Sequence, residues 1–474
     1  MSGLLVRDVL LEGERVDLRC TGGLVEAVGT DLVARPGDTV LRGAAAVLPG
    51  LHDHHLHLMA MAAHAGSVQL GTGTVAGPAD LARVLRGADR ALPAGAWLRA
   101  VGYDESTAGP LDHRVLDRLV PGRPVRVQHR SGHLWVLNSA GGDAVGLDGG
   151  PEGAVVRDAA GVPTGEVVDA DGWLGDRLPR GDTPDLGAVS RRLAARGVTG
   201  VTDATPVRRP ADLEALAAAR RDGRVVQRLT VTGGVELAGD PAPEGVTLGP
   251  VKVMVTDGTP PPLAALVERF AAAHRAGRAV AVHCVTRVAA VLAVAAWEEA
   301  GARTGDRMEH GGVLPPDTVA RLVAMGITVV TQPAFVLDRG DRYLAEVEVD
   351  DLPWLYPCAS LLRAGVPVGG STDAPFGPDD PWVAMAAAVH RRTRTGSPLG
   401  PGEAVDPGRA LGLFLSDPTA PGGPARRLRP GRPADLCLLD CTLDRALADL
   451  DASHVLATVV GGRVVHEVGM APVR

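Results

Sequence analysis

The 474-residue chain is 45% hydrophobic and 22% charged, a composition typical of a soluble globular protein with one large domain or two or three smaller ones. Its formal net charge of −8 gives no reason to expect nucleic acid or an anionic membrane as a partner. The five cysteines form no CxxC pair, and reduced thiols are simpler than a disulfide framework. No signal peptide is evident, and charged residues interrupt the most apolar stretch, so we expect a cytoplasmic protein without a membrane span.

Both ends of the chain, residues 1–48 and 426–474, contain short runs of residues that are typical of β-strands. The first end contains LLVRDVLLEG, RVDLRC and LVEAVG. The second contains ADLCLLD and HVLATVV-GG-RVVHEV, which predicts a hairpin over the Gly-Gly turn. Because chain termini often lie close together, we expect one small sheet domain assembled from both ends.

Residues 49–425 alternate apolar runs with amphipathic segments. With VLPGLHDHHLHL as the first run, the series continues as VTGVTDA, RLTVTGGV, VKVMVTDG, AVAVHCV, RMEHGGV, TVVTQPA and VPVGGSTDA. This rhythm is typical of βαβ units and favours an α/β (β/α)₈ TIM barrel, with a doubly wound sheet as the alternative.

The alternation of apolar runs and amphipathic segments is interrupted at about residues 65–195. This interval contains PVRVQHRSGHLWVLNS and a predicted hairpin, GAVVRDAAGVPTGEVVDA, which turns near Ala159 to Gly161. We interpret it as an insertion after the first barrel strand, partly β and able to cover the barrel mouth.

Several predicted strands carry a residue able to bind a metal. The first has the histidine cluster, the fourth has Lys252 near its start, and the later ones have His283, Glu309-His310 and Asp373. Each could be a structural residue by itself. Strand ends meet at one mouth of a barrel, however, where barrel enzymes place their active sites, so the joint pattern indicates a site.

Within HDHHLH, side-chain alternation decides which histidines face that site. Residues two apart in a strand point to the same face, so His55 and His57 form one pair and His52 and His54 the other. The later pair lies nearer the mouth and is the predicted ligand pair. Asp53 shares its face and is expected to orient one of the two ligands.

PGLHDHHLHL resembles the PG-x-x-D-x-H-x-H opening of the amidohydrolase superfamily, in which the HxH pair binds metal. The likeness continues through the lysine of VKVMVTDG, the histidines of AVAVHCV and RMEHGG, and the aspartate of GGSTDAP. WLRAVGYDES, SGHLWVLNSA, TQPAF and LRPGRPADLCLLD resemble the amidohydrolase-3 branch, which contains YtcJ-like proteins and N-substituted formamide deformylases. The resemblance spans nearly the whole chain and implies a barrel with a β-sandwich built from both termini.

Two departures from the branch stand out. It often has Gly-Asp after the fifth-strand histidine, where this chain has Cys284-Val285-Thr286-Arg287, and its usual Ser-Asp is Thr372-Asp373 here. Neither removes a ligand, but the first weakens any transfer of substrate specificity.

Lys252 is the one lysine among 48 Lys and Arg residues, and it lies in an apolar run. Two neighbouring metal ions need an anionic bridge, which a lysine carboxylated by CO₂ can supply. Burial favours the neutral amine that this reaction requires, whereas arginine stays protonated. The resemblance independently implies a carboxylated lysine here.

We therefore expect a hydrolase with two divalent metal ions, zinc before manganese or iron. The ligands would be His55, His57 and Asp373 for one ion and His283 and His310 for the other, bridged by the carbamate of Lys252. Metal-activated hydroxide would cleave an amide, N-acyl or N-formyl C–N bond of a small molecule. Asp373 would act as general base and then as general acid toward the leaving amine.

Tyr103, His133 and Asn138 are candidate substrate-binding residues, with structural hydrogen bonds as the alternative. Glu309 is expected to point away from His310 and to have no catalytic role.

Three other functions stay open at this point: a mononuclear deaminase of an aminated heterocycle, a lactone or ester hydrolase, and a non-catalytic barrel. The deaminase would need a His-x-x-Glu arrangement that His283 lacks. The sequence leaves the substrate open and allows a homo-oligomer.

Overall fold

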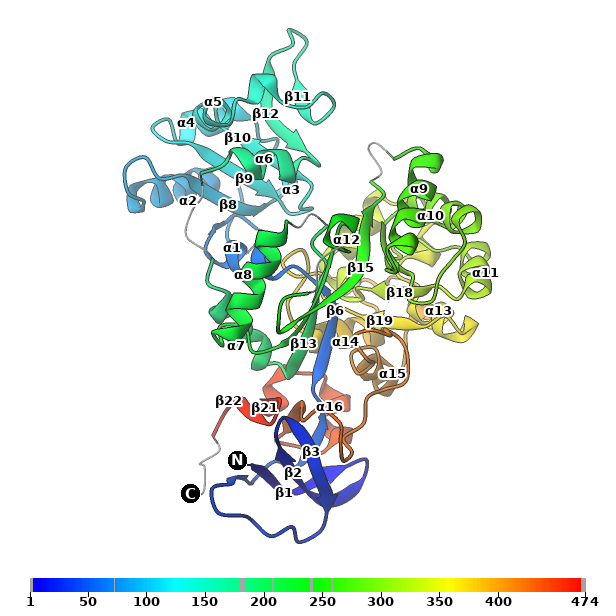
Figure 1. Ribbon diagram of the computed structural model, residues 1–474. Coiled ribbons are helices and arrows are strands. Elements are labelled where there is room, and N and C mark those ends of the chain that lie inside the picture. Colours follow the sequence, from blue (N-terminus) through cyan, green and yellow to red (C-terminus); the bar gives the residue numbers. More distant parts are fainter. Residues whose placement is uncertain are drawn as a thin grey trace. The chain divides into compact units, whose positions relative to one another are not determined.

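The computed structural model describes residues 3–71, 73–179, 184–206, 209–238, 242–256 and 260–469. The chain divides into two compact units. The barrel unit consists of Met1–Leu58 and Leu186–Arg474, and the inserted unit consists of Met59–Asp185. Figure 1 shows both units and labels many of their helices and strands.

Eight parallel strands form the barrel, which confirms the predicted fold class. Each strand pairs with the next one in sequence order, without the reversal of a doubly wound sheet. The ring is completed where the segment after the last strand meets the first: the Asp373 amide donates to the His55 carbonyl at 2.8 Å, and the His57 amide donates to the Ala374 carbonyl at 2.9 Å. The strands are β6 (Leu51–Leu56), β13 (Val198–Asp203), β14 (Arg228–Gly233), β15 (Val246–Met254), β16 (Val280–Cys284), β17 (Arg307–His310), β18 (Thr328–Thr331) and β19 (Val368–Gly370).

Most connections between barrel strands contain an α-helix; β14 and β15 are joined through a short 3₁₀ helix, η2 (Val235–Ala238). Helix α9, for example, buries Leu266, Phe270 and Ala273, a spacing that places them on one face. No helix in the described ranges is long and apolar enough to cross a membrane. The helices are α7 (Leu186–Ala194), α8 (Pro210–Arg221), α9 (Leu263–Arg275), α10 (Arg287–Ala300), α11 (Pro316–Met325), α12 (Ala334–Glu346), α13 (Cys358–Ala364), α14 (Pro381–His390) and α15 (Pro407–Gly412).

The first barrel strand is shorter than the run VLPGLHDHHLHL. The run is divided at Gly50: Ala46–Pro49 forms β5 of another sheet, and β6 begins at Leu51. A Cβ atom on Gly50 would lie 2.1 Å from Thr199 Cγ2, so the chain passes too close to β13 for any side chain here.

The two chain ends share one eight-stranded sheet, as predicted. Its order is β22-β21-β20-β5-β1-β2-β3, with β4 paired to β1, so strands from the C-terminal end continue directly into those from the N-terminal end. The hairpin predicted over Gly461-Gly462 is present. The strands are β1 (Leu4–Leu11), β2 (Glu14–Thr21), β3 (Leu24–Gly29), β4 (Thr39–Leu41), β5, β20 (Leu436–Leu439), β21 (Val455–Val460) and β22 (Arg463–Glu467), and α16 (Leu443–Asp449) follows β20.

The inserted unit has its own six-stranded sheet in the order β11-β12-β10-β9-β8-β7. The predicted hairpin is its β11–β12 pair. Its strands are β7 (Val68–Gln69), β8 (Leu98–Tyr103), β9 (Val125–His129), β10 (Leu134–Leu137), β11 (Val155–Arg157) and β12 (Pro163–Val168). Its helices are α2 (Pro78–Ala91), α3 (Glu105–Ala108), α4 (His113–Leu119), α5 (Ser139–Val145) and α6 (Asp171–Arg177), while α1 (Leu58–Ala65) follows β6.

Candidate metal centre

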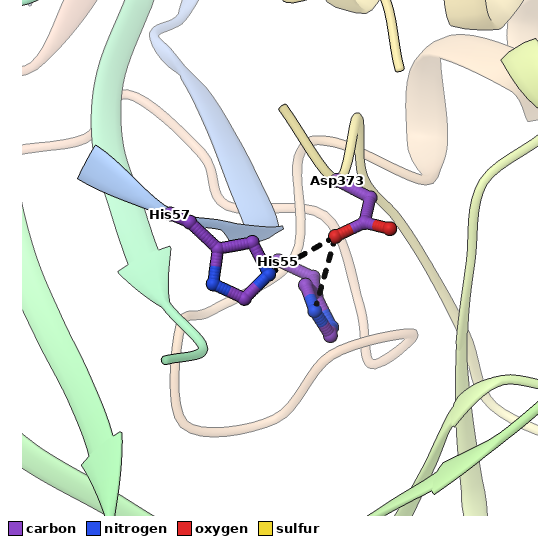
Figure 2. A group of neighbouring side chains, drawn as sticks. All are labelled: His55, His57 and Asp373. Atoms are coloured by element: carbon purple, nitrogen blue, oxygen red, sulfur yellow. Dashed lines mark hydrogen bonds and ion pairs between the residues drawn. The ribbon is translucent and has the colours of Figure 1, made fainter. Parts of the chain in front are cut away.

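Two histidines converge on one carboxylate at the carboxyl ends of β6 and β19 (Figure 2). Asp373 Oδ1 lies 3.1 Å from His57 Nε2 and 3.5 Å from His55 Nε2. One donor atom from each residue lies within 4.8 Å of the others, close enough to share a metal ion. The Phe376 ring packs edge-on against His57, with 5.5 Å between centroids.

The other two histidines of the cluster have different partners. His52 Nε2 lies 2.9 Å from Thr202 Oγ1, and His54 Nε2 lies 2.9 Å from Ser416 Oγ. Both rings are buried. The alternation along β6 therefore separates two structural histidines from the pair in Figure 2.

Asp373 is held as a carboxylate. Burial opposes its ionisation, but the hydrogen bond from His57 and the nearby His55 and His310 outweigh burial and hold its pKa well below the usual range. Its φ of 54° lies in the left-handed region, which non-glycine residues rarely adopt and which clusters at functional sites.

Asp53 fixes backbone rather than an imidazole ring. Its carboxylate accepts hydrogen bonds from the His55 amide at 3.1 Å and from the Thr372 amide at 3.2 Å and hydroxyl at 2.5 Å. The expectation that Asp53 orients one of the ligand rings was therefore wrong. It ties the end of β6 to the residue before Asp373, and burial raises its pKa to about 7.

Glu309 supplies the contact to His55 that was expected of Asp53. Its Oε2 accepts a hydrogen bond from His55 Nδ1, and its Oε1 accepts one from Arg307 Nε at 2.5 Å. All three side chains are buried. Burial opposes ionisation of Glu309, but Arg307 and His55 outweigh it and lower its pKa well below the usual range. A proton on Nδ1 leaves the lone pair of His55 on Nε2, the atom that faces Asp373.

His310 and His283 continue the row of rings. The His310 centroid lies 4.8 Å from that of His55 and 4.5 Å from that of His283. His310 Nδ1 lies 2.8 Å from Gln332 Oε1, while Gln332 Nε2 donates to Ser371 Oγ at 2.9 Å. The amide orientation puts the proton of His310 on Nδ1 and leaves Nε2 free for a metal.

Lys252 faces the same interior, and its charge interacts with His55, His310 and Glu309. In the register of β15, β16 and β17, Lys252 pairs with Ala281, Met254 with His283, and His283 with Glu309, so these side chains share the inner face. Lys252 lies near the end of β15, not near its start as predicted, because the strand already begins at Val246. Its side chain is 7% exposed and has no hydrogen bond or ion pair within the described ranges. Burial lowers its pKa.

A family model identifies the chain. The model described as "Amidohydrolase family" matches residues 41–466, most of the sequence. The chain belongs to the amidohydrolase family.

Relatives of this amidohydrolase include an N-substituted formamide deformylase from Arthrobacter pascens, which is 27% identical over 94% of both chains. The Bacillus subtilis protein YtcJ is 25% identical over 82% of this chain and 83% of its own. A crystal structure of a metal-dependent hydrolase from Pyrococcus horikoshii superposes with a TM-score of 0.76 at 20% identity, covering 96% of this chain and all of that one. The last likeness shows the shared fold.

The substrate-binding candidates of this amidohydrolase all lie in the inserted unit. Asn138 uses its full hydrogen-bonding capacity there: it accepts from the Val125 and Gly141 amides and donates to the carbonyls of Val120 and Arg123. The Tyr103 hydroxyl donates to the Gly109 carbonyl, and the side chain is 2% exposed. His133 Nδ1 lies 2.6 Å from Asp169 Oδ1. Substrate binding by these residues stays a prediction beside these structural contacts.

The sequence interpretation gave no role to three residues that lie behind the candidate ligands of this amidohydrolase: Arg307, Glu309 and Gln332. The motif TQPAF did contain Gln332, but nothing in the pattern assigned the amide a partner. Glu309 was assigned to the wrong face because strict strand alternation was assumed at His310.

Proposed function

We propose that this amidohydrolase uses two divalent metal ions to cleave a C–N bond of a small amide, N-acyl or N-formyl substrate. The metal that we propose is zinc. The observation that carries the proposal is the convergence of His55 and His57 on Asp373, together with a buried Lys252 that has no hydrogen bond or ion pair within the described ranges. The relative named as a formamide deformylase supports the bond type. The residues that would hold the metals are His55, His57, Lys252 as its carbamate, His283, His310 and Asp373.

The donor set suits such ions. Burial lowers the pKa of His55 to about 4 and that of His310 to about 3, so both imidazoles are neutral near pH 7 and offer a lone pair. Asp373 is ionised under the same conditions. Imidazole and carboxylate donors with one anionic bridge are a set that zinc accepts.

Lys252 would supply that bridge after reaction with CO₂. The neutral amine attacks the carbon of CO₂, one C–O π bond opens, and the nitrogen releases a proton, which gives a carbamate with one negative charge over two oxygens. Burial favours the neutral amine, and no described residue forms an ion pair with Lys252 that would hold it protonated.

Bound metal ions would supply a Lewis acid that activates water and polarises the substrate carbonyl. The Asp373 carboxylate would take the proton from the attacking water and return it to the leaving nitrogen. Glu309 and Gln332 would keep the Nδ1 proton on His55 and His310, so that both rings present Nε2 throughout the reaction.

Metal content and turnover of wild type and Lys252→Arg test the proposal. We expect about two metal ions per chain in the wild type, a sharp fall in Lys252→Arg, and loss of hydrolysis of N-formyl and N-acyl amides. Arg275→Lys, an exchange of the same two residue types on an exposed helix face, should change neither. In ¹³C-bicarbonate, a carbamate NMR signal should appear in the wild type and be absent from Lys252→Arg.

Contrary results would also be informative. One metal ion in both proteins, with ammonia released from an aminated heterocycle, would identify a deaminase. Turnover of lactones or esters without amides would move the proposed activity to the lactone or ester class with the same centre.

A further inference from the structure

The sheet of the inserted unit holds two arginines side by side. Arg99 of β8 and Arg126 of β9 are register partners in parallel strands, so their side chains leave the sheet on the same face. Like charges directly opposite each other on a sheet are destabilising. Burial, together with the charge of the other arginine, lowers the pKa of Arg99 to about 10.

Trp135 of β10 lies beneath both guanidinium groups. The Cζ atoms of Arg99 and Arg126 are 5.5 and 5.3 Å from the centroid of its ring. A negative indole face attracts cations at such distances and holds the two groups together despite their repulsion. Asp171 is the acid whose charge reaches both arginines, but its Oδ1 accepts a hydrogen bond from Trp135 Nε1 at 2.9 Å and forms no ion pair with either.

Neither arginine has an acceptor. The Nε atoms of Arg99 and Arg126 are buried without a hydrogen-bond partner, and neither side chain forms an ion pair or hydrogen bond in the described part of the chain. By contrast, buried Arg123 in the same unit binds Asp89 and four carbonyl oxygens. Among the described residues, the other arginines with a buried unpaired nitrogen each keep a carboxylate or carbonyl partner through another atom; they are Arg7, Arg19, Arg307 and Arg339.

We propose that Arg99 and Arg126 bind an oxyanion, a carboxylate or a phosphate group, against Trp135. Such an anion would neutralise two adjacent cations and give their N–H groups the acceptors that the described residues do not provide. Planar guanidinium groups match the geometry of these oxyanions and donate two hydrogen bonds at once. The anion could be part of the substrate or a separate small molecule, and both sources share this chemistry.

Calorimetric titration with phosphate and with succinate tests the site. Wild type should bind at least one of them saturably, and Arg99→Gln and Arg126→Gln should each weaken that binding about tenfold or more. Arg118→Gln removes the same charge from an exposed position on α4 and should bind like wild type. Arg126→Lys keeps the positive charge but lacks the two parallel N–H donors of a guanidinium group. Its affinity for the anion should lie between those of wild type and Arg126→Gln, which separates bidentate hydrogen bonding from the effect of charge alone. Circular dichroism of each variant establishes that it is folded.

Several outcomes would overturn the site. One is equal binding by wild type and both glutamine variants, as would occur if the anion bound only the candidate metal centre. Another is saturable binding of neither probe by wild type.

Kinetic measurements on the arginine variants then distinguish an anion that belongs to the substrate from a separate small molecule. This is the one part of the test that rests on the proposed function. A raised KM for an anionic amide, with an unchanged KM for its neutral analogue, would place the oxyanion on the substrate. Unchanged kinetics with lost anion binding would assign a separate ligand. Because titration needs no turnover, failure of the proposed function leaves the test of the anion site intact.

Discussion

Glu309 and His310 are adjacent in β17, yet both contact His55. A regular strand turns successive side chains to opposite faces, but the φ of 70° at His310 ends that alternation. On β6, parity separates His55 and His57 from His52 and His54, and the two pairs have different partners in the structure. Parity misassigned Glu309 because a left-handed residue cannot be recognised from a His-Gly-Gly sequence alone.

Replacing Glu309 with Gln should lower zinc affinity and kcat/KM by about 10- to 100-fold, the usual effect of losing a partner behind a metal ligand. The amide keeps the size of the side chain, but it removes the charge that holds His55 Nδ1–H and leaves Arg307 without its carboxylate. Zinc competition with a chromophoric chelator measures the affinity. Glu298→Gln, which breaks an exposed ion pair with Arg321, is the matched control. An unchanged affinity in Glu309→Gln would show that Glu309 does not position His55.

At the scale of elements, all eight barrel strands correspond to predicted runs, because alternating apolar runs and amphipathic helices are visible in sequence. The division of VLPGLHDHHLHL at Gly50 was not predicted. It depends on β13 passing close to Gly50 and on a hydrogen bond from the Gly50 amide to the Asp435 carbonyl, both of which join residues far apart in the chain.

Gly50→Ala should destabilise the protein by about 1–3 kcal/mol, since the new methyl group would overlap Thr199 and force the two strands apart. Urea unfolding of the variant measures the change. Adding Thr199→Ala removes two of the three atoms that the methyl group meets and should recover part of the loss, so the two substitutions should not be additive. Additive losses would contradict the steric explanation. Gly87→Ala, on a helix where a Cβ meets nothing within 4 Å, serves as the control.

For the whole molecule, the sequence predicted one sheet from both chain ends and a separate insertion. Short β-like runs and a Gly-Gly hairpin are local signals, and they were sufficient to predict the shared sheet and the presence of an insertion. The side-chain networks behind the candidate ligands were not predictable in this way. The contact of His55 with Glu309 joins residues 254 positions apart, and that of Asp53 with Thr372 joins residues 319 apart, so neither is expressed in any short spacing.

The buried histidines make the stability of the whole protein sensitive to acid. Burial lowers the pKa of His52 well below its usual value and that of His54 to about 3, while His55 falls to about 4 and His310 to about 3. Below the unfolded value of about 6.5 the unfolded chain therefore binds more protons than the folded one, and stability falls with pH down to the folded values. Asp53 has the opposite effect, because its raised pKa of about 7 lets the folded protein bind a proton that the unfolded chain does not hold until lower pH. This offsets one of the four protons that the histidines take up on unfolding.

We expect the free energy of unfolding of the metal-free protein to fall by several kcal/mol between pH 6.5 and pH 4, because each uncompensated proton contributes about 1.4 kcal/mol per pH unit. Urea midpoints across this range in the presence of EDTA measure the slope. His54→Gln removes one buried histidine that is not a candidate ligand and should reduce the slope by about one proton. Equal slopes for wild type and His54→Gln would mean that His54 takes up no proton on unfolding and would contradict its share of the acid sensitivity.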